Sequence, residues 1–261
     1  MDKHNPQLGL TVLNGDWGAT SLSAILGVLE SVFKELSTVT GQLPDDRIEV
    51  SRWRRDHPLV VQGRRPYKIY LTASDTYWSQ YVYQFSHELC HVLIRSDRFT
   101  DHKHKWFEEA LCEAASLFVL RRLVAAWTQA PPHSVFKAEE FAPSHGTYAE
   151  RVERRHAVDQ ETSLANWFLD HCEELASDRY NRSLNGVVAV ALLREFRKNT
   201  TLWRDCTALN SWDANQDEDF RAYLNSWSSN LAGSHAGPRL PCVVARRLGI
   251  AGTTGSPFHR A

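Results

Sequence analysis

The sequence lacks most of the features that assign a chain to a specialised class of protein. No apolar run approaches the roughly 18 residues needed to span a bilayer, and the N-terminus lacks the basic-then-apolar order of a secretory signal. The five cysteines are odd in number, widely scattered and without a C-x-x-C pair, which argues against a disulfide framework. These absences predict a cytoplasmic protein with reduced thiols and no membrane association.

The sequence also lacks an excess of charge of one sign. The formal net charge is -1, so the chain has no general attraction for nucleic acid or acidic membranes. Short basic runs occur at residues 52–55, 63–66 and 151–156, but acidic residues balance them along the chain. We therefore expect these runs to form solvated faces, and we expect no nucleic-acid partner.

The hydrophobic pattern predicts an α+β fold. Residues 8–14, 47–53, 58–62 and 67–73 are short segments that are apolar or alternate, as strands do, and residues 21–36 have helical spacing. From about Asp75 the pattern turns helical. The sequence thus predicts strands and one helix before a helical region.

Two helices are expected in the middle of the chain, at about residues 75–94 and at 106–127. The second is apolar on most of its circumference and is expected to be buried. Residues 133–160 have mixed character and are interpreted as loop with some helix. Further helices are expected at 161–177, 183–198 and 217–231.

The chain shows no internal repeat and no flexible linker that marks a boundary. We divide it into an N-terminal lobe at residues 1–128 and a mostly helical C-terminal lobe at 129–231. The tail at 232–261 is rich in Gly, Ser, Thr and Pro and is expected to be partly flexible.

The segment HELCH at residues 87–91 carries the strongest chemical signal. A helix turns by about 100° per residue, so His87 and His91 project from one face, one turn apart. Two imidazoles at that spacing can bind one tetrahedral metal ion, and Glu88 then points beside the ion, where it can hold and deprotonate a water molecule. This arrangement is typical of zinc hydrolases.

The helix expected at 106–127 supplies further carboxylates. Glu109 and Glu113 lie one turn apart on its surface, and a chain that folds back after His91 can bring them to the two histidines. Glu109 is the expected third ligand. Glu113 is expected to accept a hydrogen bond from the outer N–H of a ligand histidine. Two carboxylates on a buried helix need such partners.

With these motifs the sequence resembles the gluzincin-type zinc metallopeptidases of the zincin superfamily. In that family HExxH is followed by a glutamate on the next helix, as HELCH is followed here by EEALCE. The resemblance covers roughly residues 47–125. It implies a zincin-like N-terminal lobe, a bound Zn²⁺ ion, a peptide or protein substrate, and an edge strand over the cleft. We expect the peptide to lie antiparallel to the strand near 67–73.

The resemblance also implies a downstream Tyr or His that steadies the oxyanion. Tyr180, just before an expected helix, is the first candidate, and Tyr148, His145 and His171 remain open. The G-x-M-E-N segment with which related aminopeptidases hold a free N-terminus is absent from the sequence. An exopeptidase activity is therefore not supported.

Other residues compete for the place of third ligand. Asp97 follows His91 by six residues, as in metzincin-like sites, but Ile94 replaces the glycine that those sites use for the turn. His102 and His104 could complete a three-histidine site, and Glu113 could bind the metal directly. Two nearby cysteines are expected to pack as small apolar residues; these are Cys90 and Cys112.

Two functional hypotheses follow. The first is a zinc-dependent peptidase in which Glu88 is the general base and the zinc-activated water attacks the peptide bond. The second is a non-catalytic, zinc-stabilised binding or sensing protein on the same fold. The intact Glu88 favours the enzyme, because a protein that only binds does not need a general base. A metal-free protein would have to accommodate Glu109 and Glu113 on a buried helix without a cation.

Overall fold

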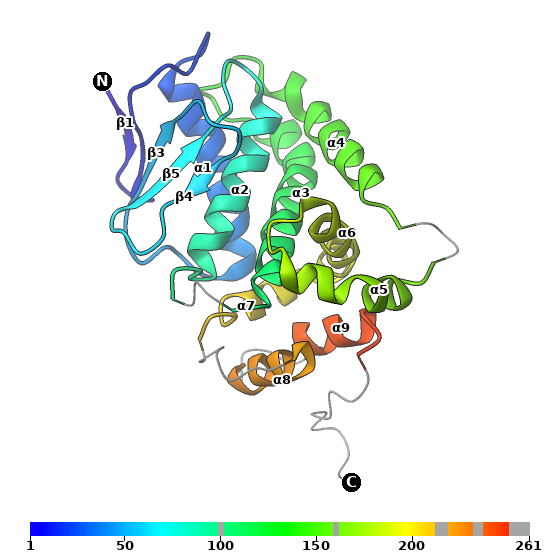
Figure 1. The fold of residues 1–261 in the computed structure, drawn as a ribbon. Coiled ribbons are helices and arrows are strands. Elements are labelled where there is room, and N and C mark those ends of the chain that lie inside the picture. The colour runs from blue at the N-terminus through cyan, green and yellow to red at the C-terminus, as the bar shows by residue number, and fades with distance from the viewer. Residues whose placement is uncertain (99–101, 159–161, 212–218, 232–236, 251–261) are drawn as a thin grey trace.

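The computed structural model describes residues 1–98, 102–158, 162–211, 219–231 and 237–250. Within these ranges the chain forms a small mixed sheet and a larger set of helices, so the expected α+β class is confirmed (Figure 1). No helix in the described part combines the length and the apolarity that crossing a bilayer requires.

The sheet has the strand order β1-β2-β3-β5-β4. β2, β3 and β5 run parallel, while β1 and β4 pair antiparallel at the two edges. Side chains of β5 alternate between buried and half-buried, so one face of the sheet belongs to the core and the other faces solvent. The strands are Lys3–Asn5 (β1), Leu10–Val12 (β2), Ile48–Arg52 (β3), Leu59–Val60 (β4) and Tyr67–Leu71 (β5).

The strand expected at 67–73 is present as β5, but the expectation that it forms the edge of the sheet is wrong. β5 lies between β3 and β4, and Val61 N–H bonds to the Lys68 carbonyl oxygen at 2.9 Å. The edge strand is therefore β4. Its two residues are too few to show the alternation by which a strand is recognised in a sequence.

Two helices cover the buried face of the sheet. α1 (Leu22–Thr40) packs against β1 and β2, and α2 (Trp78–Leu93) packs against β4 and β5. The Ser21 hydroxyl accepts a hydrogen bond from the Ala24 N–H and begins α1, and Gly41, with φ of 68°, ends it in the left-handed conformation. Figure 1 shows both helices between the sheet and α3 (Lys105–Gln129).

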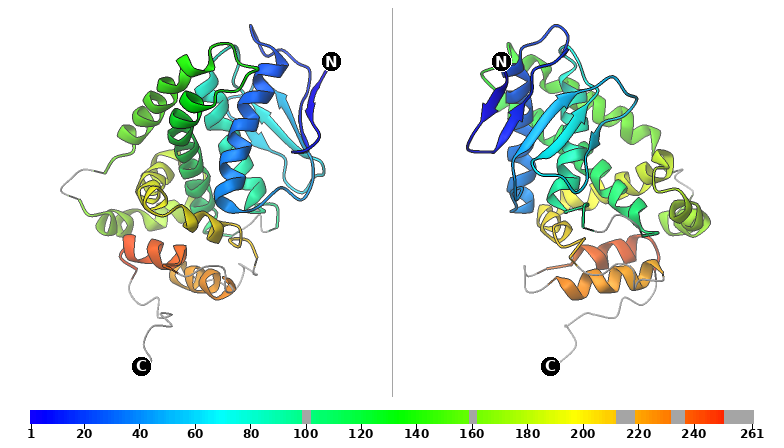
Figure 2. Two further views of the ribbon diagram at one scale, coloured as in Figure 1. Left: turned by 180° about the vertical axis from the view of Figure 1, so that it is seen from behind. Right: turned by 60° about the vertical axis from the view of Figure 1, so that its left-hand side comes forward.

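The central helix is α3 (Lys105–Gln129), against which α1, α2, α4, α5 and α6 all pack (Figure 2). Its predicted burial is confirmed, since apolar side chains from Trp106 to Trp127 are enclosed on several sides. The remaining helices are α4 (Ala138–Arg155), α5 (Leu164–Ser177), α6 (Arg182–Lys198), the 3₁₀ turn η1 (Thr200–Leu202), α7 (Trp203–Cys206), α8 (Phe220–Asn230) and α9 (Leu240–Arg247).

Several described elements differ from the sequence prediction, including the short η1 and α7, which were not expected. Residues 133–160, interpreted as loop with some helix, contain the long helix α4. Pro143 and Gly146 have low helix propensity and weaken the helical pattern of this segment. Packing on α3 compensates for those two residues. The tail at 232–261 contains α9, and the rest of that predicted flexible segment lies largely outside the described residues. β1 was not predicted, because its three residues are exposed or half-buried and show no hydrophobic alternation.

Candidate metal centre

The HELCH motif lies in the last two turns of α2. His87 and His91 occupy one face of the helix, with ring centroids 5.0 Å apart. His91 is buried, whereas the His87 side chain is 19% exposed. The four-residue spacing therefore produces the expected pair of imidazoles, with one of them open to solvent.

Glu109, on the first turns of α3, faces this pair. Its Oε2 lies 3.2 Å from His87 Nε2, and its Oε1 lies 3.6 Å from His91 Nε2. The three side chains have ligand atoms within 4.8 Å of one another. Tetrahedral zinc ligands, each about 2.0–2.1 Å from the ion, are about 3.3–3.4 Å apart. The three residues are of types that bind zinc, and they lie close enough together to hold a metal ion.

Glu88 lies beside this group and is almost completely buried, at 4% exposure. Burial raises the pKa of its carboxyl group, while the charges of His87 and His91 oppose that rise. A raised pKa brings a carboxyl group closer to the range in which it can both accept and return a proton near neutral pH.

The edge strand β4 packs against α2 and turns the peptide groups of Val60 away from β5. Val61 N–H bonds to the Lys68 carbonyl, so the neighbouring pair Val60–Ile69 is a non-hydrogen-bonded pair of the antiparallel ladder. Val60 therefore directs its N–H and C=O away from β5. A backbone hydrogen bond from Val60 also lowers the pKa of Glu88 against the larger effect of burial. The general-base candidate is thus hydrogen-bonded to the edge strand.

The outer nitrogen of His91 has a buried hydrogen-bond partner. His91 Nδ1 lies 2.8 Å from Ser96 Oγ, and that hydroxyl makes a short hydrogen bond to Glu108. Lys105 Nζ lies 2.8 Å from both Glu108 oxygens, and Asn210 Nδ2 lies 2.8 Å from Oε2. His91 is therefore held from behind by a connected set of polar groups.

The charges of this region are unevenly distributed. Burial opposes ionisation of Glu108, but the hydrogen bond from His91 and the charge of Lys105 outweigh it and lower its pKa to about 2. Burial likewise opposes ionisation of Glu109, yet the two histidines lower its pKa. Lys105 thus balances the charge of Glu108, whereas Glu109 faces the two imidazoles with no lysine or arginine beside it among the described ion pairs.

The outer nitrogen of His87 is held less closely. Its Nδ1 lies 3.9 Å from Glu113 Oε2, which is longer than a hydrogen bond. The Tyr83 hydroxyl instead donates a short hydrogen bond to Glu113. The structure thus places Glu113 beside the metal-binding face, as the sequence predicts, but its direct partner is Tyr83.

The competing third ligands lie in other contacts. Asp97 is paired with Arg65 at 3.0 Å, and Glu113 is not part of the three-residue group found among the described residues. His102 stacks on Tyr223 and His104 packs against Phe220. Two cysteines are buried between helices, as expected for packing, and are free thiols: Cys90 and Cys112.

The candidates for the oxyanion-stabilising residue are dispersed. His145 is fully buried, with Nδ1 2.9 Å from Ser79 Oγ, and His171 bonds to the Trp167 carbonyl. Tyr180 is 64% exposed in the turn between α5 and α6.

Tyr148 is connected to the centre through Tyr83 and Glu113. Its ring centroid is 5.4 Å from that of Tyr83, which in turn contacts Glu113. Burial raises the pKa of the Tyr148 hydroxyl, so it stays protonated as a hydrogen-bond donor. Among the four candidates, Tyr148 thus has the contacts that connect it to the histidine face.

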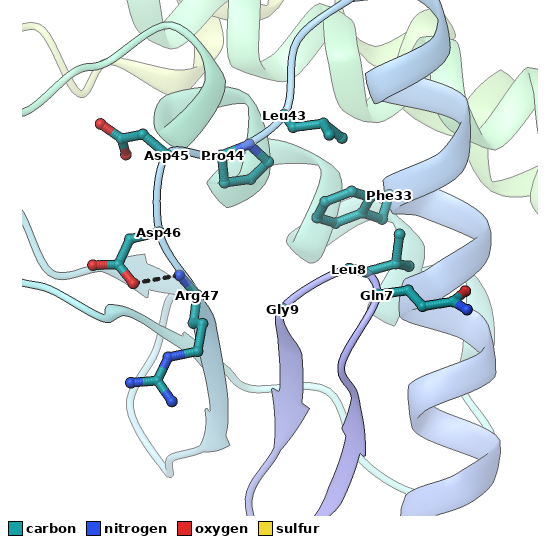
Figure 3. Close-up of a pocket in the computed structure, with 9 residues that line it drawn as sticks. All are labelled: Gln7, Leu8, Gly9, Phe33, Leu43, Pro44, Asp45, Asp46 and Arg47. Carbon is teal, nitrogen blue, oxygen red and sulfur yellow. Dashed lines mark hydrogen bonds between the residues drawn. The ribbon is translucent and has the colours of Figure 1, made fainter.

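A separate pocket of about 280 Å³ lies between α1 and the turns before β2 and β3 (Figure 3). Its acidic residues are engaged elsewhere, since Asp45 pairs with Arg95 and Asp46 accepts a hydrogen bond from the Arg47 N–H. This pocket therefore offers no second cluster of ligands.

The residues behind His91 were not found from the sequence. Glu108 and Lys105 carry a weak signal, an opposite-charge pair three residues apart at a helix start. Ser96 and Asn210 carry none, because Asn210 is 102 positions from its partner Glu108. Only the folded chain brings them together.

Comparison of the chain with protein-family models, with curated proteins and with solved structures found no match.

Proposed function

We propose that the protein is a zinc-dependent peptidase of gluzincin type, with a zincin-like N-terminal lobe. The observation that carries the proposal is the grouping of His87, His91 and Glu109, each of which offers one ligand atom within 4.8 Å of the others. Imidazole nitrogens and a carboxylate oxygen are donors that zinc accepts. The residues would hold the ion from two helices that pack directly against each other. When bound, zinc supplies a more acidic water molecule and polarises a carbonyl group.

Glu88 performs the proton transfers of this reaction. Its carboxylate takes a proton from the attacking water and then delivers it to the leaving amine as the peptide C–N bond breaks. Its burial suits both steps, because the raised pKa brings the carboxyl group closer to neutral pH, where it can accept a proton and give it back. Tyr148 is the first choice for a donor to the oxyanion, ahead of the exposed Tyr180.

The substrate is an extended peptide bound along β4. Val60 directs its N–H and C=O away from β5, the N–H bonds to Glu88, and the neighbouring Leu59 is 38% exposed. Main-chain hydrogen bonds to a strand edge select for an extended backbone more than for particular side chains. We therefore propose internal peptide bonds in flexible segments as the class of substrate.

The cysteines suit a reducing compartment. All five are free thiols, and Cys90 and Cys112 are buried close to the proposed centre. We accordingly propose a cytoplasmic location, where thiols remain reduced.

The test compares wild type with Glu88→Gln, using a quenched peptide library for activity and mass spectrometry for zinc content. We expect about one zinc per chain in both and a fall in activity of roughly 10²–10⁴-fold in the variant, the usual contribution of a general base. Glu140→Gln, on the exposed surface of α4, is the matched control and should leave both quantities unchanged. Full activity in Glu88→Gln with zinc still bound would refute the mechanism.

A non-catalytic zinc protein is the second candidate, favoured by one observation. The four proposed oxyanion donors are dispersed, and no described hydrogen bond links any of them to the His87, His91 and Glu109 group. If wild type binds zinc and captures extended peptides without cleaving any member of the library, this second function replaces the first.

A further inference from the structure

The turn that ends α2 folds the chain back against His91 on the same helix. Ser96 N–H donates to the His91 carbonyl oxygen at 3.0 Å, and Arg95 N–H donates to that of Val92 at 3.1 Å. Arg95 has a φ of 56°, so the helix ends in a left-handed residue followed by a reversal of direction. The reversal places Ser96, five residues along the chain, against the ring of His91.

The donors and acceptors around Ser96 determine where its proton lies. The Glu108 oxygens receive Lys105 Nζ and Asn210 Nδ2, both of which are donors, so Glu108 acts as a carboxylate that only accepts. The Ser96 hydroxyl has one proton and donates it to Glu108. Its oxygen must then accept from His91 Nδ1, which lies 2.8 Å away. His91 Nδ1 therefore carries the hydrogen.

This assignment leaves Nε2 as the ring nitrogen that can bind a metal, and Nε2 faces Glu109 Oε1 at 3.6 Å. We propose that Ser96 and Glu108 are positioning residues that set the tautomer and ring orientation of His91 for metal binding. The inference rests on the proposed function, since it concerns the same metal centre. It adds the residues that prepare one of the ligands.

Ser96 and Glu108 are buried, and Asn210 holds them from a distant part of the chain. Glu108, Ser96 and Asn210 are each at most 3% exposed. A buried carboxylate is costly unless it is paired and fully hydrogen-bonded, and here both of its oxygens have partners. Asn210 also donates to the Ile94 carbonyl at 2.9 Å, so one amide holds both Glu108 and the turn.

His87 provides an internal comparison. Its Nδ1 lies 3.9 Å from Glu113, which is too far for a hydrogen bond, and Glu113 instead accepts a hydrogen bond from the Tyr83 hydroxyl. The two proposed histidine ligands are therefore prepared to different degrees. His91 is oriented before the metal arrives, whereas His87 keeps more freedom.

The experiment measures zinc affinity with a competing chelating dye, and the visible absorption spectrum after loading with Co²⁺. Ser96→Ala removes the nearer acceptor at Nδ1 and leaves Glu108 Oε1 at 3.4 Å. It should lower zinc affinity by roughly 10–100-fold and shift the cobalt bands. Ser96→Thr keeps the hydroxyl and should restore both readings. Ser116→Ala is the matched control, because Ser116 is an equally buried serine whose hydroxyl bonds only to backbone carbonyls.

Glu108→Gln is the second variant, and its circular dichroism is recorded with that of Ser96→Ala. It should also lower zinc affinity, because its side-chain amide lacks the charge that anchors the Ser96 proton. Zinc affinity and cobalt spectra equal to those of Ser116→Ala, in either folded variant, would overturn the positioning role. Zinc bound by His91→Ala as tightly as by wild type would instead overturn the proposed metal centre itself.

Discussion

His145 allows a sharp test of how burial sets the charge of a side chain. It lies in α4 at 0% exposure, with Nδ1 2.9 Å from Ser79 Oγ and its ring edge against Trp127 at 4.5 Å between centroids. Burial lowers the pKa of His145 to about 4, and no charged neighbour contributes to the shift. The histidine is therefore neutral in the folded chain.

The sign of the pH effect follows from that shift. In the unfolded chain a histidine has a pKa of about 6.5, so below that pH the unfolded state binds a proton that the folded state does not. Stability from this group is fully present above about pH 6.5 and is lost as the pH falls toward 4. Each unit within that window costs about 1.4 kcal/mol, so we expect His145 to remove about 2 kcal/mol between pH 7 and pH 5.

The assay is urea unfolding of wild type and His145→Asn at pH 7, 6 and 5. Asparagine keeps a polar atom near the position of Nδ1 for Ser79 but has no proton to gain. The variant should be less stable at pH 7 and should lose about 2 kcal/mol less than wild type on going to pH 5. His104, whose pKa burial also lowers to about 4, is present in both proteins and cancels. Equal losses in the two proteins would refute the assignment of His145 as a buried neutral histidine.

Two further predictions concern the metal and the helix contacts. Zinc at 100 times its Kd should stabilise wild type by about 2.7 kcal/mol and raise its Tm by roughly 5–10 °C. In a thermal-shift assay, Glu109→Gln should abolish most of this rise. An equal rise in the variant would exclude Glu109 as a ligand. Gly186→Ala should destabilise by about 1–3 kcal/mol in urea, because its Cβ would lie 2.5 Å from the ring of His156. Gly146→Ala, whose Cβ would meet only Val124 at 3.4 Å, should instead stabilise by about 0.4–1 kcal/mol, and destabilisation of both would contradict this distinction.

Periodicity made several elements predictable from local sequence. α1, α2 and α3 carry long apolar faces, and β3 and β5 alternate, so each was expected close to its observed position. α4 was missed because its stability comes from packing on α3, and its own residues include Pro143 and Gly146. The order of the sheet was also unpredictable, because β4 pairs with β5 through a contact that two residues alone cannot signal.

The candidate centre divides in the same way. HELCH by itself determines that His87 and His91 share a face and that Glu88 lies beside them, because the geometry of a helix fixes neighbours three and four residues apart. The apolar pattern of residues 106–127 separately predicts the buried helix that carries Glu109. These are local relations, and any folded chain that keeps the two helices keeps them.

Only the tertiary structure decided which groups surround these residues. The packing of α3 on α2 brings Glu109 to 3.2 Å from His87, and the fold carries Asn210 to Glu108 across 102 positions. It also places Val60 of β4, rather than β5, at the sheet edge beside Glu88. Such contacts join segments with no local relation, so they are determined when the whole core excludes water, and their distances follow from that packing.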